Sequence, residues 1–138
     1  MSFDLATGVR DYLATGKVSG LPHALFMDGV FHAAESRQSM PTWDPGTGRV
    51  FSEFAAGQAE DVDRAVLSSQ KALKGEWSRF TPSQRGKLLR NIAELIRKNS
   101  DRLSFVEALD SGKRLDEAMG DVAGAANCFD YYAGASDK

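Results

Sequence analysis

The chain has 138 residues, the usual size of a single domain, and carries 17 Lys and Arg residues against 19 Asp and Glu residues. A formal net charge of −2 without long runs of one sign argues against nucleic acid and anionic membrane as partners. The single cysteine excludes an intrachain disulfide and no apolar run reaches the length of a transmembrane helix, so the composition favours a cytoplasmic protein.

Residues 1–20 are predicted to form an N-terminal extension with one short helix. Its apolar residues recur at helical spacing: Leu5, Val9, Tyr12 and Leu13. Asp4 is placed to cap the start of this helix, and Gly16 is placed to end it.

Two β-hairpins are predicted after this extension. Residues 24–27 and 30–32 are separated by Asp28-Gly29, the dipeptide that most readily supplies two positive φ values. A second pair of segments, residues 39–43 and 49–55, flanks a cluster of turn-forming residues at 44–48. We expect these segments to form a small antiparallel sheet of three or four strands.

Three amphipathic helices are predicted next, the first over residues 58–74. Residues 81–113 carry the longest helical signal, and Thr81, Pro82 and Gln84 predict a capping box at its start. Cap-type residues at 99–101 interrupt the apolar repeat, so we expect a long helix, a kink and a shorter helix that ends at Gly112.

A last helix is predicted from about residue 116 to residue 132 or beyond. It is rich in small residues: Gly120, Ala123, Gly124, Ala125 and Ala126. Each glycine costs a helix roughly 1 kcal/mol relative to alanine, so a neighbour should come close to the backbone here. A tight helix crossing and a ligand channel are equally good explanations of this stretch.

Two glycine-containing segments resemble nucleotide-binding motifs incompletely. After Gly46-Thr47-Gly48, Phe51 stands where a dinucleotide fingerprint needs its third glycine, and a strand is predicted where a helix should follow. Gly112-Lys113 lacks the first glycine of a phosphate loop, because Glu107 stands there, and Arg114 replaces the required Ser or Thr. We reject both motifs.

The remaining reactive side chains form no catalytic constellation. Glu107 and Asp110 lie three residues apart on one helical face, where they could hold a cation or share a proton. Ordinary solvated or salt-bridged carboxylates are the favoured alternative. Cys128 has no histidine nearby in the sequence and is predicted to be a small buried hydrophobic residue. The residues alone therefore predict a soluble α+β domain with amphipathic helices.

Six segments in this order resemble the N-terminal part of an NAD(P)-dependent aldehyde dehydrogenase. They are LFMDGVF (25–31), DPGTGRVF (44–51), AEDVDRAV (59–66), WSRFTPSQRGKLL (77–89), EALDSGK (107–113) and DVAGAANCFDYYAG (121–134). The resemblance implies that residues 21–138 are the first part of a cofactor domain, cut before the strands of its Rossmann-type α/β sheet. As a fragment, the chain is expected to be α+β, with a small hairpin sheet and three or four amphipathic helices.

The family resemblance implies that the catalytic nucleophile, the general base and the cofactor loops come later in the family sequence. It therefore implies no catalytic or cofactor-binding residue in this chain, and neither NAD nor NADP is expected to bind to it alone. It implies part of a monovalent-cation site at Thr42, Trp43 and Asp110, although Trp43 and the neighbouring Asp44 depart from the usual family residues. It also implies that Gly120 and Gly124 line the substrate channel.

We therefore interpret the chain as a scaffold segment of an enzyme that oxidises an aldehyde with NAD(P)⁺, inactive by itself. The alternatives are a non-catalytic module that docks on full-length subunits and a freestanding α+β domain. Helices that lack their sheet should leave an apolar patch exposed, which favours self-association or docking on aldehyde dehydrogenase subunits. The residues expected in the patch are Leu88, Ile92, Leu95, Val122, Ala126 and Phe129.

Overall fold

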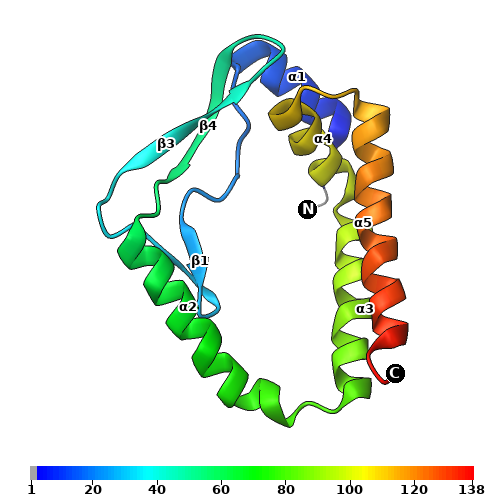
Figure 1. Ribbon diagram of the computed structural model, residues 1–138. Helices are drawn as coiled ribbons and strands as arrows, with labels where there is room; N and C mark the ends of the chain where they lie inside the picture. Colours follow the sequence, from blue (N-terminus) through cyan, green and yellow to red (C-terminus); the bar gives the residue numbers. More distant parts are fainter. Residues whose placement is uncertain (1–2) are drawn as a thin grey trace. The chain divides into compact units, whose positions relative to one another are not determined.

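The computed structural model describes residues 3–138, which form an α+β arrangement of five α-helices, one short 3₁₀ helix and four strands (Figure 1). The elements are, in chain order, α1 (Leu5–Thr15), β1 (Leu25–Met27), β2 (Val30–His32), β3 (Ser39–Asp44), β4 (Arg49–Ala55), α2 (Ala59–Lys74), η1 (Glu76–Arg79), α3 (Pro82–Lys98), α4 (Ser100–Ser111) and α5 (Leu115–Ala135). They divide into two compact units. We call residues 17–43 and 50–79 the hairpin unit, and residues 3–16, 44–49 and 80–138 the helical unit.

The first hairpin of the hairpin unit has the predicted two-residue turn. Met27 pairs with Val30 and Leu25 pairs with His32 in antiparallel register. Asp28 and Gly29 have φ values of 52° and 79°, the left-handed conformations that such a turn requires. The predicted hairpin is therefore confirmed.

The four strands pair differently from the expectation of one sheet. They form two separate two-stranded sheets, β1 with β2 and β3 with β4. A two-stranded sheet has little stability of its own, so each hairpin depends on side-chain packing. Phe51 on β4 is only 2% exposed, whereas Phe26 on β1 and Phe31 on β2 are exposed.

Helix α2 is fixed at its start by one buried carboxylate. Asp61 is 3% exposed and accepts hydrogen bonds from the backbone N–H groups of Gln58, at 3.0 Å, and Glu35, at 3.1 Å. It therefore satisfies one free N–H group at the helix N-terminus and ties the loop after β2 to α2.

The helical unit contains the predicted long helix, break and shorter helix. Thr81 N–H donates to the Gln84 side chain at 2.8 Å and Gln84 N–H donates to the Thr81 hydroxyl at 3.3 Å, which completes the predicted capping box. α3 ends before Asn99, and α4 runs from there to Gly112, whose φ of 71° stops it.

Helices α3 and α5 lie side by side and meet through small side chains (Figure 1). Ala93 of α3 and three alanines of α5, Ala118, Ala126 and Ala133, are at most 5% exposed. Ala126 therefore belongs to this interface, and its expected place in an exposed patch was wrong. Leu88 and Leu95 of α3 are exposed as expected, whereas Ile92, Val122 and Phe129 are half-buried.

Large hydrophobic side chains in the described part of the chain are more often exposed than buried. Seventeen are exposed, while the eight buried hydrophobic residues include five alanines. On α2 the exposed ones are Val62, Val66, Leu67 and Leu73. Among residues 3–138, no helix is both long enough and apolar enough to cross a membrane.

Candidate functional site

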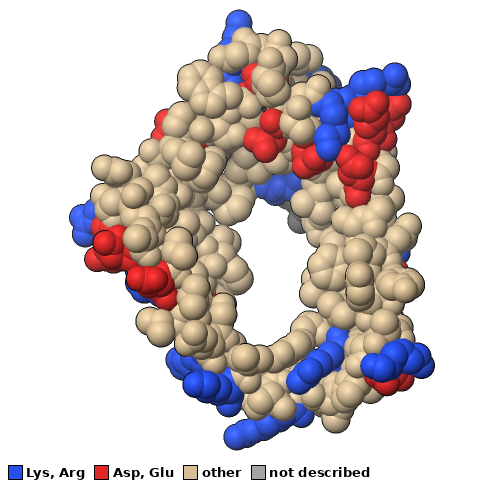
Figure 2. Space-filling view, in the orientation of Figure 1, with Lys and Arg blue, Asp and Glu red and all other residues tan. Residues whose placement is uncertain are grey.

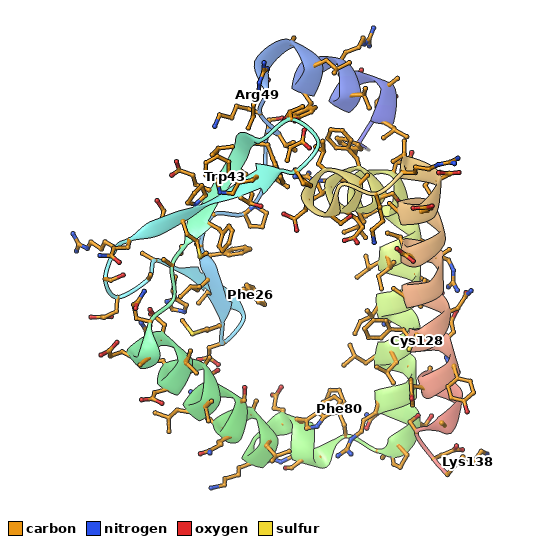
Figure 3. All side chains as sticks on the ribbon, turned by 45° about the horizontal axis from the view of Figure 1, so that its top comes forward. Phe26, Trp43, Arg49, Phe80, Cys128 and Lys138 are labelled. Carbon is orange, nitrogen blue, oxygen red and sulfur yellow. The ribbon has the colours of Figure 1, made fainter. Side chains whose placement is uncertain are left out.

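Helix α5 has two faces of opposite character. Its alanines at positions 118, 126 and 133 recur at intervals of seven and eight and are buried, whereas Gly120, Gly124 and Cys128 recur every four residues and are exposed. Intervals of four place the second group on one stripe of the helix. The prediction that Cys128 is buried was wrong, because it lies on this exposed stripe of α5 (Figure 3).

The glycines of this stripe are not explained by helix packing within residues 3–138. A Cβ atom added at Gly120 or Gly124 would meet no heavy atom of a neighbouring residue within 4 Å. By contrast, a Cβ atom at Gly86 of α3 would lie 2.6 Å from Ser136 Oγ and 2.7 Å from the Ala133 carbonyl oxygen. The tight crossing is therefore at Gly86, and the backbone of α5 stays accessible at Gly120 and Gly124.

A hollow of about 440 Å³ opens between α3, α4 and α5. Its apolar lining is formed by Ile96, Leu103, Val122 and Ala125, and two carboxylate residues, Glu107 and Asp121, complete it. A small apolar hollow with a few polar groups is the common form of a binding site for small molecules.

Both carboxylates of this hollow are held by one ammonium group. Lys113 Nζ donates to Glu107 Oε1 at 2.5 Å and to Asp121 Oδ2 at 2.7 Å, so it links the end of α4 to α5. The hydrogen bonds to Asp121 and then to Glu107 raise the pKa of Lys113 well above its ordinary value. Charged groups gather at this junction of α4 and α5 (Figure 2). The salt-bridged alternative for Glu107 is thereby confirmed.

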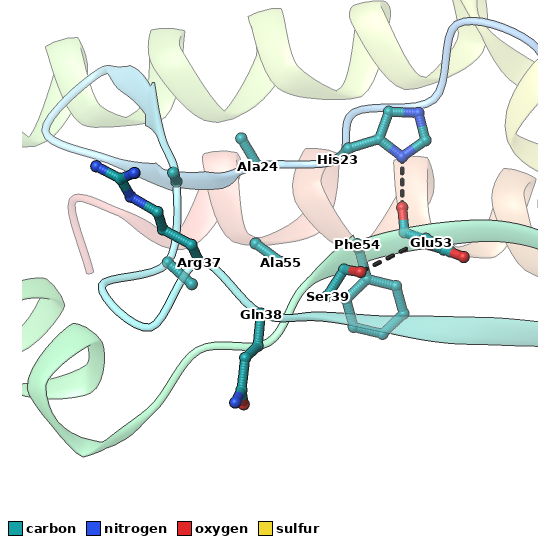
Figure 4. Close-up of a pocket in the computed structure, with 10 residues that line it drawn as sticks. His23, Ala24, Arg37, Gln38, Ser39, Glu53, Phe54 and Ala55 are labelled. Carbon is teal, nitrogen blue, oxygen red and sulfur yellow. Dashed lines mark hydrogen bonds between the residues drawn. The ribbon is translucent and has the colours of Figure 1, made fainter.

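The hairpin unit has its own shallow hollow of about 470 Å³ (Figure 4). Its lining contains four alanines: Ala24, Ala33, Ala34 and Ala55. At one side, His23 Nδ1 hydrogen-bonds the carbonyl oxygen of Glu53, and Ser39 Oγ donates to the Glu53 carboxylate at 3.1 Å. Both hydrogen bonds go to Glu53, one to its backbone carbonyl and one to its carboxylate, so the polar side of the hollow is organised around this residue.

Asp44 is buried at the end of β3 and receives several hydrogen bonds. Its Oδ1 accepts from Gly46 N–H at 2.8 Å and its Oδ2 accepts from Thr47 Oγ1 at 2.8 Å and from the Tyr12 hydroxyl. These bonds, led by the one from Tyr12, lower the pKa of Asp44. Sequence reasoning missed this pair, because Tyr12 matched an ordinary apolar helical stripe and Asp44 an ordinary turn residue.

The residues predicted to bind a monovalent cation fall in both units. Thr42 is half-buried and Trp43 is exposed on β3 of the hairpin unit, while Asp110 is exposed in the last turn of α4 in the helical unit. A hydroxyl, a backbone carbonyl and a carboxylate are oxygen donors of the kind that hard cations prefer. Within residues 3–138, no group of three His, Cys, Asp or Glu side chains is arranged to hold a metal.

Residues 31–138 match the model of the aldehyde dehydrogenase family. The chain is similar to an aldehyde dehydrogenase from Aspergillus niger, with 38% identity over 85% of this chain and 24% of the relative. An aldehyde dehydrogenase-like protein from Schizosaccharomyces pombe is 35% identical over the whole chain and 28% of its own length. The fold is similar to that in a crystal structure of Staphylococcus aureus betaine aldehyde dehydrogenase with NAD⁺, with a TM-score of 0.86 and 31% identity over 92% of this chain and 26% of that one.

Proposed function

Because the chain belongs to the aldehyde dehydrogenase family, we propose that it is a scaffold segment of an enzyme that oxidises an aldehyde to a carboxylic acid with NAD(P)⁺. It spans about a quarter of the length of the relatives it matches. The observation that carries the proposal is the family match over residues 31–138 combined with this partial coverage of the relatives. The chain contributes packing surface and a channel wall, and the chemistry belongs to the remaining three quarters.

Exposed hydrophobic side chains support the need for a partner. Leu95 on α3 is 57% exposed and Leu67 on α2 is 63% exposed, although both lie on amphipathic helices. Removing apolar surface from water contributes about 25 cal/mol per Å², so covering several such side chains favours association. We propose that the rest of an aldehyde dehydrogenase covers them.

Gly120 and Gly124 are proposed to widen a substrate passage in the complete enzyme. Within residues 3–138 their backbone faces open space, which leaves room for a ligand beside α5. A bulky side chain at either position should then obstruct large aldehydes more than small ones. This part of the proposal predicts a change in substrate preference and no loss of folding.

The test is reconstitution from two pieces. The purified 138-residue chain is mixed with the Aspergillus niger relative lacking the segment that this chain matches, and aldehyde-dependent formation of NADH is measured. We expect no activity from either piece alone and activity from the mixture. NADH formation by the 138-residue chain alone would overturn the proposal.

Two matched variants test whether the exposed apolar face of α3 forms the contact between the chain and the truncated relative. Leu95→Asp places a charge on the exposed apolar side of α3 and should prevent reconstitution, whereas Arg90→Asp on the same helix changes a charged exposed position and should permit it. Circular dichroism checks that both variants stay folded. In the active mixture, Gly124→Leu should lower kcat/KM for a bulky aldehyde more than for acetaldehyde.

A non-catalytic docking module is the second candidate, and the same exposed side chains favour it. In this case the chain binds an intact aldehyde dehydrogenase and changes its assembly. Adding the chain to the intact relative should then alter its activity, while the truncated relative should stay inactive in the mixture.

A cytoplasmic location and the cation ligands Thr42, Trp43 and Asp110 remain part of the proposal for the complete enzyme.

A further inference from the structure

The N-terminal helix α1 is too short to be stable without tertiary contacts. It has 11 residues, includes Gly8, and is bounded by the Asp4 cap and by Gly16 at a φ of 68°. Isolated helices shorter than about 12–15 residues are marginal in water. The contacts that hold α1 therefore determine whether it forms.

Those contacts converge on one aromatic side chain of α4. The ring of Phe105, which is 5% exposed, lies 6.4 Å from the ring of Tyr12 in α1, edge to face, and 5.7 Å from the ring of Phe3, which precedes α1. The next residue of α1, Leu13, is 75% exposed. One face of α1 thus packs on α4 and the other faces away from it.

Tyr12 also makes the polar contact between α1 and the turn at residues 44–48. Its hydroxyl donates to Asp44, and both side chains are buried, at 8% and 6% exposure. A hydrogen bond to a charged acceptor contributes more to stability than a hydrogen bond to a neutral acceptor does. The same carboxylate organises the turn through the N–H of Gly46 and the hydroxyl of Thr47.

The turn at residues 44–48 also packs against the end of α4. A Cβ atom at Gly112 would lie 2.7 Å from Cγ of Pro45, so only a glycine lets the proline ring approach this closely. Gly112 is also the residue whose φ of 71° ends α4. The turn is therefore held between Tyr12 on one side and the C-terminal cap of α4 on the other.

We infer that α1 holds the turn at residues 44–48 in place: the hydrogen bond from Tyr12 to Asp44 keeps this turn packed against the end of α4. We call this arrangement of Tyr12, Asp44 and the turn the clamp. The inference is independent of the proposed function. It makes the order of the turn conditional on the docking of an N-terminal segment, so detachment of α1 releases the turn and the α4 cap together and leaves the α3 and α5 pair unchanged.

Hydrogen exchange of the 138-residue chain tests the clamp through defined amides. Gly46, Thr47 and Gly48 N–H groups bond to Asp44, and Gly112 N–H bonds to the Ala108 carbonyl. In Tyr12→Phe these amides should exchange about tenfold faster or more, as loss of one charge-assisted hydrogen bond requires. Amides in the middle of α3 and α5 should keep their wild-type rates, as should all amides in the control Leu13→Ala.

A double-mutant comparison separates the clamp from a general packing role. If Tyr12 acts through Asp44, Tyr12→Phe should have little further effect in a chain that already carries Asp44→Asn. Additive effects of the two substitutions, or wild-type exchange at the turn in Tyr12→Phe, would overturn the inference. Should Tyr12→Phe fail to fold, exchange of the wild-type chain in low denaturant decides: α1, the turn and the α4 cap must open together, before α3 and α5.

Discussion

Replacing Gly86 by alanine is predicted to destabilise the helical unit. The new methyl group would lie 2.7 Å from the Ala133 carbonyl oxygen, a backbone atom that moves only with α5, and 2.6 Å from Ser136 Oγ. Overpacking of this kind costs about 1–3 kcal/mol, against up to about 1 kcal/mol gained from the higher helix propensity of alanine. We expect a net loss of about 1–2 kcal/mol in the free energy of unfolding.

Gly120→Ala is the matched control, because it makes the same chemical change on the partner helix in open space. It should stabilise the chain by up to about 1 kcal/mol. Urea unfolding followed by circular dichroism measures both variants. The reasoning fails if Gly86→Ala is as stable as the wild type, or if the two variants change stability in the same direction.

Three further predictions concern single side chains. Ser104 Oγ is buried and has no hydrogen-bond partner among residues 3–138, so Ser104→Ala should leave the free energy of unfolding unchanged or raise it by about 1 kcal/mol in urea unfolding. Gly29→Ala should destabilise the first hairpin by about 1–2 kcal/mol, because its φ of 79° strains any other residue, and nuclear magnetic resonance should show weaker pairing of β1 with β2. The pKa of Lys113 is raised in the folded chain. The ion pairs of Lys113 therefore stabilise the fold fully below the ordinary lysine pKa of 10.5, and this stabilisation is lost only as the pH rises through the higher pKa of the folded state. The stability difference between wild type and Lys113→Gln should therefore stay constant from pH 7 to about pH 10.

The features predicted correctly from the sequence depend on residues that are close together in the chain. Asp28 and Gly29 alone form the turn between β1 and β2. Thr81 and Gln84, which cap the start of α3, lie within four positions of each other. Their energetics are local, so the pattern alone identifies them. The fold class followed, because the spacing of apolar residues indicates each helix and strand separately.

The features that were missed depend on residues far apart in the chain. Tyr12 and Asp44 are 32 positions apart, and neither residue type indicates the other. Cys128 was expected to be buried because cysteine usually is, yet its position on α5 relative to the buried alanines places it outside. Burial on a helix is decided by what lies beside each face, which a sequence with a weak apolar stripe does not specify.

The glycines on the exposed face of α5 should have opposite effects in the isolated chain and in a complete enzyme. Glycine at positions 120 and 124 lowers helix stability, and within residues 3–138 no neighbour makes use of the space that it leaves. A residue that costs stability without a local benefit is understandable when the benefit lies in a larger assembly. The same substitution, Gly120→Ala, should therefore stabilise the 138-residue chain and, in a reconstituted enzyme, narrow the passage proposed beside α5. If it stabilises the chain and leaves the preference of the reconstituted enzyme for small over bulky aldehydes unchanged, the open face of α5 has no role in admitting substrate.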